Sequence, residues 1–417
     1  MSAASPEPTT DGGAPVGLGG PRSRLPAAVV ALGLASFFND IGSEMCFPLL
    51  PAFLVTLGAG PTALGVIEGL ADAVASLLKV VAGHLADRLP RVKPLVGVGY
   101  GLPCGVRPLL SICTAPWQVL GVRLVDRVGK GLRTAPRDAL IAAAVEDQDA
   151  GRAFGFHRAM DHAGGMIGPL VATALLALGL EVREVFLAAL VPSLIALVAV
   201  ATVREHARAR PASPVPASAS SAAPGSGARE KLPRTFRAYL GWIALFSIAN
   251  SSDAFLLLRA SELGVATTSL PLLWTALHVS RVACTAWGGR LADRFPRARL
   301  VAVGWGIFAL CYLGLGFATA AWQVWLVFLA YGLHTGICEP AERALIRELA
   351  PEAARGRAYG QFHGVVGLCA IPAGFGMGWI WQAIGGTIAL SGAAALAVLA
   401  ALGLSAWDRA RHAASPR

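Results

Sequence analysis

The chain has 417 residues, of which 55% are hydrophobic and only 14% are charged. Charged residues make up about a quarter of an ordinary soluble domain, so this composition excludes a water-soluble globular protein. The formal net charge of +10 does not indicate a nucleic-acid partner, because lysine and arginine are concentrated in tails and short loops between apolar segments. Seven cysteines stand singly without a CxxC pair, so neither a disulfide framework nor a zinc site is indicated.

Apolar runs recur along the whole chain, and each is long enough to cross about 30 Å of hydrocarbon as a helix. We therefore predict an all-α integral membrane protein with twelve transmembrane helices. The predicted spans are residues 26–57, 61–86, 94–114, 117–141, 153–180, 184–203, 238–260, 267–289, 299–318, 321–342, 358–384 and 386–407.

The first predicted span follows a tail, residues 1–25, that is rich in Pro, Gly and Thr and is predicted to be disordered and cytoplasmic. Asp40 and Glu44 interrupt this span and, being four residues apart, share one helical face. An ionisable residue inside a span is costly unless it is paired or faces water, so both are functional candidates. Two neighbouring carboxylates in a low dielectric repel each other, which makes the pair a candidate proton carrier. The alternative is a pair neutralised by Arg or Lys of the fourth span.

A short basic loop follows the second span and returns about 205 residues later. The first copy reads Gly83-His-Leu-Ala-Asp87-Arg88-Leu-Pro-Arg91, and the second reads Gly289-Arg-Leu-Ala-Asp293-Arg294-Phe-Pro-Arg297. The same offset relates Trp117-Gln118 to Trp322-Gln323 and Gly151-Arg152 to Gly356-Arg357. Duplicated helical halves are typical of secondary transporters, in which the substrate path runs between the halves.

The fourth and fifth spans carry further ionisable residues. Arg123 and Asp126 lie in the fourth span, and His157 and Asp161 lie in the fifth. A His–Asp pair at helical spacing can move a proton near pH 7, or it can ligate a divalent metal with help from another helix. This end of the fifth span also lies close to the cytoplasmic surface, where charges cost little, so both interpretations stay open.

The middle of the chain, residues 204–233, is rich in Ala, Ser and Pro and is predicted to be a flexible cytoplasmic linker. It separates two six-span halves, residues 26–203 and 234–407, and a second cytoplasmic tail follows at 408–417. The loops between spans 1–2, 3–4, 9–10 and 11–12 carry no lysine or arginine. This positive-inside pattern places both termini in the cytoplasm, and an even number of spans in each half makes the halves parallel repeats.

The second half has fewer charged residues within its spans. Asp253 in the seventh span is our candidate for a cavity-lining carboxylate, because Asn250 and two serines stand beside it. Trp274 and Tyr331 are weaker candidates for the same cavity.

The duplicated loop resembles the signature loop of the major facilitator superfamily, and the resemblance extends over essentially the whole chain. It implies two six-helix halves around a central cavity and a cytoplasmic gate in which Asp87 faces a helix terminus of the other half. A carboxylate at a helix N-terminus is stabilised by the backbone dipole. The gate residues that the two loops imply are Gly83, Asp87, Arg88, Arg91, Gly289, Asp293, Arg294 and Arg297.

The fifth span resembles the antiporter signature of the same superfamily through Gly155, Gly164, Gly168 and Pro169, but it departs from that signature at Ala172-Thr173. The resemblance implies proton-coupled export. Small residues at this spacing also let two helices approach closely, so the alternative is a packing seam without directional meaning. Arg123 fits the arginine of the family's fourth-span motif, which implies a role in proton coupling.

These features predict a secondary active transporter that works by alternating access, with proton-coupled efflux of a small organic molecule or drug. We expect a multi-pass monomer in the cytoplasmic (inner) membrane, whose partners are its substrate, protons and the lipid bilayer. No nucleotide-binding loop is present, so ATP, cofactors and a resident metal are not expected. The candidate proton-coupling and cavity residues are Asp40, Glu44, Arg123, Asp126, His157, Asp161, Asp253 and Tyr331.

Two alternatives remain at this point. Proton-coupled export of a metal ion or metal chelate is suggested by His157, Asp161 and His162. A polytopic membrane enzyme is the remote alternative, because the candidate residues lack a nucleophile and base set.

Overall fold

The computed structural model describes residues 25–205 and 232–413, and every regular element in these two ranges is a helix. Residues 1–24 of the predicted tail and residues 206–231 of the predicted linker lie outside these ranges. The elements in chain order are α1 (Ala27–Cys46), η1 (Phe47–Leu49), α2 (Leu50–Thr56), α3 (Pro61–Arg88), α4 (Lys93–Val106), η2 (Arg107–Ile112), α5 (Pro116–Ala143), α6 (Asp147–Ala177), α7 (Val182–Ala188), α8 (Leu190–Thr202), α9 (Arg234–Ala249), α10 (Ala254–Glu262), η3 (Thr267–Ser269), α11 (Leu270–Arg294), α12 (Arg297–Gly316), α13 (Ala321–Leu349), η4 (Glu352–Ala354), α14 (Arg355–Ile384) and α15 (Gly386–Ala413).

These elements form the twelve predicted membrane-crossing segments, so the all-α fold is confirmed. Five spans are built from two or three consecutive elements: α1–η1–α2, α4–η2, α7–α8, α9–α10 and η3–α11. The first span changes to a 3-10 turn at Phe47–Leu49, where Pro48 and Pro51 remove backbone donors. The seventh span is interrupted at residues 250–253, between α9 and α10.

Several helices extend beyond the apolar runs that predicted them. Helix α6 begins at Asp147, six residues before the predicted span, and α13 continues seven residues beyond it to Leu349. Helix α15 continues to Ala413, so the predicted tail at 408–417 is helical as far as that residue. These extensions are polar helix ends, and hydropathy marks the apolar core of a membrane helix better than its ends.

Seven segments are long and apolar enough to cross a membrane by length and composition alone, among the residues described. They are 93–112, 182–202, 234–262, 297–316, 321–349, 355–384 and 386–413. Trp117 and Trp322 stand in the first turns of α5 and α13 and are 71% and 63% exposed. Exposed tryptophans at helix ends fit the interface between lipid and water, which supports the membrane assignment.

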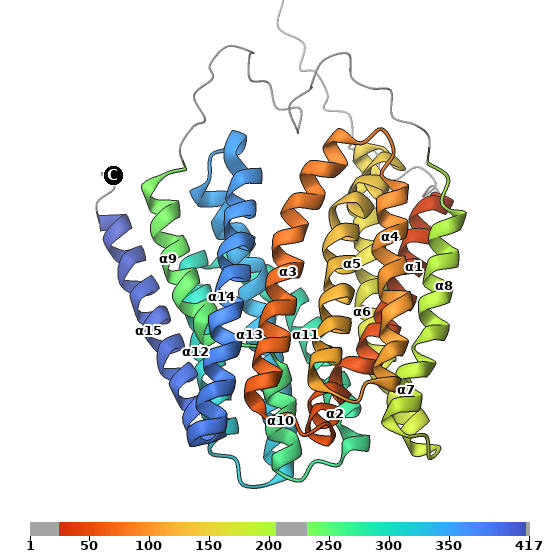
Figure 1. Ribbon diagram of the computed structural model, residues 1–417. Helices are drawn as coiled ribbons and strands as arrows, with labels where there is room; N and C mark the ends of the chain where they lie inside the picture. The colour runs from red at the N-terminus through yellow and green to blue at the C-terminus, as the bar shows by residue number, and fades with distance from the viewer. Residues whose placement is uncertain (1–24, 206–231, 414–417) are drawn as a thin grey trace, which may run out of the picture.

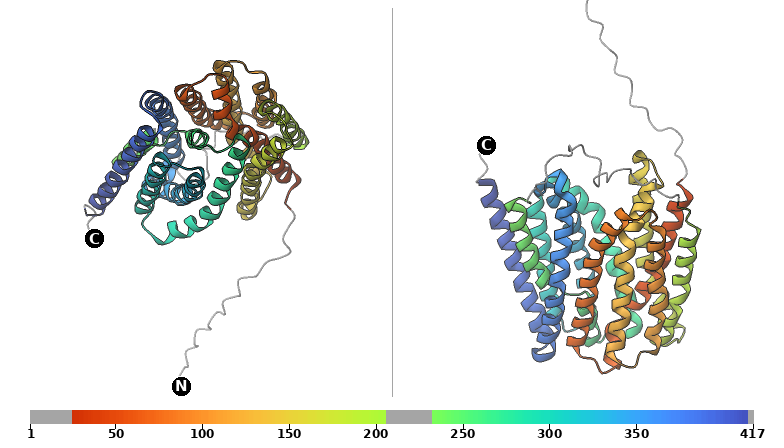
Figure 2. Two further views of the ribbon diagram at one scale, coloured as in Figure 1. Left: turned by 90° about the horizontal axis from the view of Figure 1, so that it is seen from below. Right: turned by 45° about the horizontal axis from the view of Figure 1, so that its top comes forward.

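The two halves lie side by side, with α1–α8 in one and α9–α15 in the other (Figures 1 and 2). Within the first half α1 packs against α6 and α8, and α5 packs against α3 and α4. Within the second half α13 packs against α11 and α12, and α15 packs against α9 and α12. Both halves therefore bury their apolar faces mainly within themselves, as expected of two bundles that move relative to each other.

The halves meet along two helix pairs, α3 with α14 and α6 with α11. Glycines permit the first contact: Gly65 and Gly374 face each other so closely that a Cβ on either would collide with the other's carbonyl. At the end of the bundle opposite the last turn of α8 and the first turn of α9, α2 and η1 also contact α10, and η1 contacts α11. Figure 1 shows α2 and α10 together at this lower end. The molecule is therefore closed at that end.

Candidate functional site

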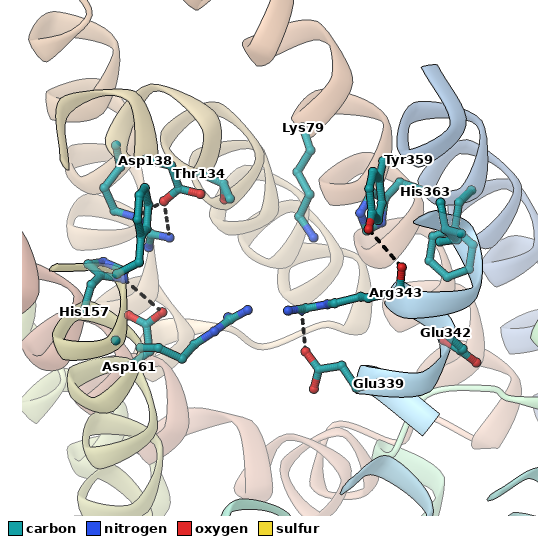
Figure 3. Close-up of a pocket in the computed structure, with 16 residues that line it drawn as sticks. Lys79, Thr134, Asp138, His157, Asp161, Glu339, Glu342, Arg343, Tyr359 and His363 are labelled. Atoms are coloured by element: carbon teal, nitrogen blue, oxygen red, sulfur yellow. Dashed lines mark hydrogen bonds and ion pairs between the residues drawn. The ribbon is translucent and has the colours of Figure 1, made fainter. Parts of the chain in front are cut away.

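A cavity of about 860 Å³ lies between the halves, a volume within the range of small-molecule sites. Helices α3, α5 and α6 form one wall, and α13 and α14 form the other (Figure 3). The charged or titratable residues of the first wall are Lys79, Arg137, Asp138, His157, Arg158 and Asp161. Those of the second wall are Glu339, Glu342, Arg343 and His363. The lining residues lie toward the α5–α6 and α13–α14 connections, at the same end as the last turn of α8 and the first turn of α9.

Two smaller pockets continue this cavity deeper into the protein. A pocket of about 390 Å³ shares Glu339 and His363 with the main cavity and reaches Asp253 and Tyr331. Another pocket, of about 270 Å³, shares Asp253 with the 390 Å³ pocket and is also lined by Asp72. Charged side chains therefore line each of these three pockets between the halves, together with apolar ones.

His157 and Asp161 of α6 lie together on the first wall, and both border the cavity. His157 Nδ1 lies 3.6 Å from Asp161 Oδ2, and His157 Nε2 lies 2.8 Å from Ser36 Oγ. Ser36 Oγ also lies 2.8 Å from Tyr100 Oη and accepts a hydrogen bond from Arg137 Nη1 at 3.2 Å. His157 Nε2 is therefore within hydrogen-bond distance of Ser36, whereas the contact of Nδ1 with Asp161 is too long for a hydrogen bond. Asp161 keeps one buried oxygen without a hydrogen-bond partner among the described residues.

In the second half, three residues that the sequence analysis selected surround Arg281, which it did not select. They are Asp253, Trp274 and Tyr331. Arg281 of α11 donates to Asp253 Oδ2 at 2.6 Å, and Tyr331 donates its hydroxyl hydrogen to Asp253 Oδ1 at 2.9 Å. The Arg281 guanidinium also lies over the Trp274 and Tyr331 rings, 5.6 and 5.7 Å from their centroids. Asp253 precedes α10, at the break in the seventh span, and this break brings its carboxylate to the cavity.

The carboxylate of Glu44 lies where the two halves meet. Its Oε2 accepts a hydrogen bond from Trp274 Nε1 at 2.7 Å and lies 3.7 Å from His278 Nε2. Both partners are on α11, whereas Glu44 is on α1, so this contact joins the halves. Asp40, one turn earlier, accepts a hydrogen bond from Asn39 Nδ2 at 2.9 Å.

Arg123 and Asp126 do not line the cavity, contrary to their selection as candidates from the sequence. Arg123 donates two hydrogen bonds to the Glu68 carboxylate, at 2.8 and 2.7 Å, and is 5% exposed. Asp126 accepts from Arg107 Nε at 2.7 Å and is 2% exposed. Each charge has a partner on another element, which is what buried ions require. These residues join α3, α5 and η2 inside the first half, and a relay role for Arg123 stays a prediction.

The glycines of the antiporter-like pattern pack against the helix that carries the candidate proton site. A Cβ on Gly164 would collide with Phe37 O and lie 3.1 Å from Asp40 Cβ. A Cβ on Gly168 would lie 2.6 Å from Ile41 O and 3.1 Å from Glu44 Cβ. Gly155 has open space around it, and Pro169 lies inside α6. The seam places α6 directly on the face of α1 that bears both carboxylates.

The two signature loops lie at the cavity end of the molecule. Gly83 and Arg88 are in the last turns of α3, and Arg91 is exposed in the loop that follows. The side chain of Asp87 lies outside the described part of the structure, so its contact with the other half stays a prediction. A carboxylate does meet a helix terminus here, but it is Glu205, which accepts hydrogen bonds from Val92 N at 2.8 Å and Lys93 N at 2.9 Å.

In the second copy, Gly289, Asp293 and Arg294 occupy the last turns of α11, and both charged residues are exposed. Arg297 begins α12 and donates to Glu348 Oε2 at 2.8 Å. Arg411 of α15 donates to the other oxygen of Glu348 at 2.9 Å. The second loop is therefore tied to its own half.

Sequence reasoning missed several cavity residues, namely Arg137, Asp138, Arg158, Glu342 and Arg343. They lie in polar helix ends, where charges cost little, so a search for charges inside apolar runs overlooks them. A metal site is not supported, because the described residues contain no group of three or more His, Cys, Asp or Glu side chains that could hold an ion. His157 is engaged with Ser36 instead.

Twelve spanning helices in two halves around a polar cavity define a polytopic membrane transporter. The family model for the Major Facilitator Superfamily matches residues 32–374, and the chain belongs to this superfamily. Members of this superfamily are transporters, which argues against the enzyme alternative.

Two relatives and two solved structures show the range of similar proteins. The chain is 27% identical over 361 residues to an uncharacterized MFS-type transporter of Methanocaldococcus jannaschii, covering 85% of this chain and 88% of that protein. It is 26% identical over 341 residues to the multi-drug resistance efflux pump PmrA of Streptococcus pneumoniae, covering 78% and 82%. The POT family transporter PepTSo aligns with a TM-score of 0.76 at 12% identity, over 94% of this chain and 100% of that one. The nucleoside transporter NupG aligns at 0.74 and 13% identity, over 92% and 99%. Identities this low show the fold alone.

Proposed function

We propose that this protein exports a small organic molecule in exchange for protons, by alternating access between its two halves. The observation that carries the proposal is the contact of Glu44 with Trp274 and His278. A titratable group lies there on the surface that must separate when the closed end opens. Loss or gain of a proton at Glu44 changes the strength of that contact, because a charge-assisted hydrogen bond is about twice as strong as a neutral one.

Charged groups from several helices surround the two carboxylates. Lys130 of α5 interacts electrostatically with both Asp40 and Glu44. Arg133 of the same helix and Asp161 of α6 interact electrostatically with Asp40. The backbone carbonyl of Lys130 accepts a hydrogen bond from Thr134, whereas its side-chain ammonium has no hydrogen bond or ion pair with any described residue. A carboxylate pair with one unpaired ammonium nearby can exchange protons without leaving an isolated charge in the membrane.

The export direction is supported by two observations. PmrA, a relative over most of the chain, is described as a multi-drug resistance efflux pump. In addition, Gly164 and Gly168 bring α6 against Asp40 and Glu44, so movement of α6 directly alters the surroundings of both carboxylates. This arrangement couples the antiporter-like seam to the proposed proton site.

In the proposed topology both termini and the basic loops are on the cytoplasmic side of the inner membrane, following the positive-inside pattern. The cavity then faces the cytoplasm, and the closed end at α2 and α10 faces the opposite side. One chain supplies both cavity walls, so a monomer is sufficient for transport.

The test is proton movement in everted membrane vesicles that contain the whole chain. Vesicles are acidified internally by respiration, and an acridine dye reports the pH difference while organic solutes of either charge are added. We expect at least one solute to release protons from these vesicles but not from vesicles that carry Asp40→Asn with Glu44→Gln. Proton release that is unchanged in the double variant, or absent for every solute, would contradict the proposal.

A further inference from the structure

We propose that the exported molecule is an organic anion, and that Lys79 and Arg158 bind its acid group. This inference rests on the proposed export function and specifies its substrate class. The inference depends on which charged residues of the cavity have partners. Most of the carboxylates contact a basic group, whereas two of the cations, Lys79 and Arg158, have no ion pair with a described residue.

Most cavity carboxylates already contact a basic group. The three pairs are Arg137–Asp138, Arg343–Glu339 and His157–Asp161. The remaining carboxylate, Glu342, lies beside the Trp305 indole on the second half. Asp138 and Glu339 are therefore neutralised by arginines, and Asp161 contacts the imidazole of His157.

Lys79 and Arg158 border the same cavity without a hydrogen bond or ion pair to any described residue. Lys79 interacts electrostatically with three cations and one carboxylate, namely Arg127, Arg137, Arg158 and Asp72. That carboxylate is shared with Arg127, whose Nε lies 4.0 Å away. Positive charge is in excess on this wall.

The opposite wall carries one arginine, Arg343, which is paired with Glu339. Lys79 of α3 and Arg343 of α13 both point into the cavity (Figure 3). His363 on α14 is also influenced by both of these cations. Lysine and arginine form their strongest hydrogen bonds with carboxylate, phosphate and similar anions. An acid group beside the first wall would therefore bind Lys79 and Arg158, whose side chains have no ion pair with any described residue.

The rest of the cavity fits an organic body. Phe154 of α6 and Tyr359 and Phe362 of α14 line it beside the cationic groups. Aromatic rings with a few convergent polar groups are typical of small-molecule sites. The structure thus favours an aromatic or partly apolar anion over a lipophilic cation, which would meet the unpaired Lys79 and Arg158.

Binding to the purified, detergent-solubilised whole protein tests this inference with two dyes that share a xanthene ring system. One is 6-carboxyfluorescein, an anion, and the other is rhodamine 123, a cation, and fluorescence anisotropy reports binding of each. We expect the wild type to bind 6-carboxyfluorescein more tightly than rhodamine 123. Lys79→Gln and Arg158→Gln should each weaken 6-carboxyfluorescein binding about tenfold, as expected for the loss of a charged hydrogen bond.

Two further variants separate binding from folding. Arg409→Gln removes an exposed cation from α15, outside the cavity, and should bind as the wild type does. Lys79→Arg keeps the charge and should restore most of the affinity that Lys79→Gln loses. The inference is overturned if the wild type does not bind 6-carboxyfluorescein, if it prefers rhodamine 123, or if both glutamine variants bind normally.

The same dyes in everted vesicles distinguish this inference from the proposed function. Proton-linked transport of rhodamine 123 without binding of 6-carboxyfluorescein would leave export standing and refute the anion. Binding of 6-carboxyfluorescein to the cationic groups without any proton-linked flux would support the anion site and refute proton-coupled export.

Discussion

Trp274 of α11 donates its indole hydrogen to Glu44 of α1 at 2.7 Å, and this hydrogen bond joins the two halves of the protein. A hydrogen bond of the same kind, from Trp381 to Glu262 at 2.8 Å, lies entirely within the second half. Each glutamate accepts a tryptophan hydrogen bond, but Glu262 also pairs with Arg259 of its own helix at 3.1 Å. If Glu44 couples protons to movement of the halves, the two glutamates must differ in function. This pair provides a matched comparison.

Glu44→Gln should abolish solute-dependent proton release, reducing it to the level of vesicles without the protein. The amide can still accept the Trp274 hydrogen bond, but it cannot bind and release a proton. Glu262→Gln should leave proton release near the wild-type level, because Glu262 does not join the halves. Measurements of the pH difference in everted vesicles check both variants, and equal losses in the two would refute a special role for Glu44.

Gly168→Ala should slow transport and lower stability by about 1–3 kcal/mol, the usual cost of overpacking. Its Cβ would lie 2.6 Å from Ile41 O, so α1 and α6 would have to separate. Gly155→Ala is the control within the same pattern, because no atom lies within 4 Å of its added Cβ. Thermal unfolding of the purified variants, with proton release in vesicles, tests this difference. A Gly168→Ala protein as stable and active as Gly155→Ala would show that the seam tolerates a side chain.

Hydropathy and the repeated loops were sufficient to predict the twelve helices and the two halves, because each helix buries or exposes its own apolar run. They could not predict which charges meet in space. Asp253, Tyr331 and Trp274 were selected separately, yet all three contact Arg281 of α11. Of the three, only Trp274 lies on the same helix as Arg281. Such contacts depend on how helices pack, and periodicity within one segment does not contain that information.

Arg123 shows a second limit. Its resemblance to the family's fourth-span arginine made it a candidate for proton coupling, and the structure pairs it with Glu68 inside the first half. Glu68 lies in another span, and both side chains are almost fully buried. A buried pair and a cavity residue look the same in a single sequence, because both interrupt an apolar run.

Arg123→Gln should therefore impair folding more than coupling. Removing one partner of a buried ion pair costs about 3–5 kcal/mol, because the other charge is left uncompensated. The double variant Glu68→Gln with Arg123→Gln should be more stable than Arg123→Gln alone, since neither charge then remains. Thermal unfolding in detergent measures both, and a fully stable Arg123→Gln protein without proton release would instead support a direct coupling role.

Glu205→Ala should lower stability by about 0.5–2 kcal/mol, the range found for the loss of a helix cap. Its carboxylate accepts two backbone hydrogen bonds at the start of α4, from Val92 and Lys93. Arg204→Ala, at the exposed neighbouring position, is the control and should unfold at the wild-type temperature. Equal unfolding temperatures for all three proteins would mean that this cap contributes nothing.

The central claim is that proton binding at Asp40 and Glu44 shifts the two halves between opposite openings. Distances between spin labels test it most directly, with one pair at Ala143 and Arg347 near the cavity mouth and another at Thr56 and Ala266 at the closed end; all four positions are exposed. On a change from mildly alkaline to acidic pH, one distance should lengthen while the other shortens, and Asp40→Asn with Glu44→Gln should abolish both changes. Distances that do not respond to pH in the wild type, or that change in the same sense at both ends, would contradict the claim.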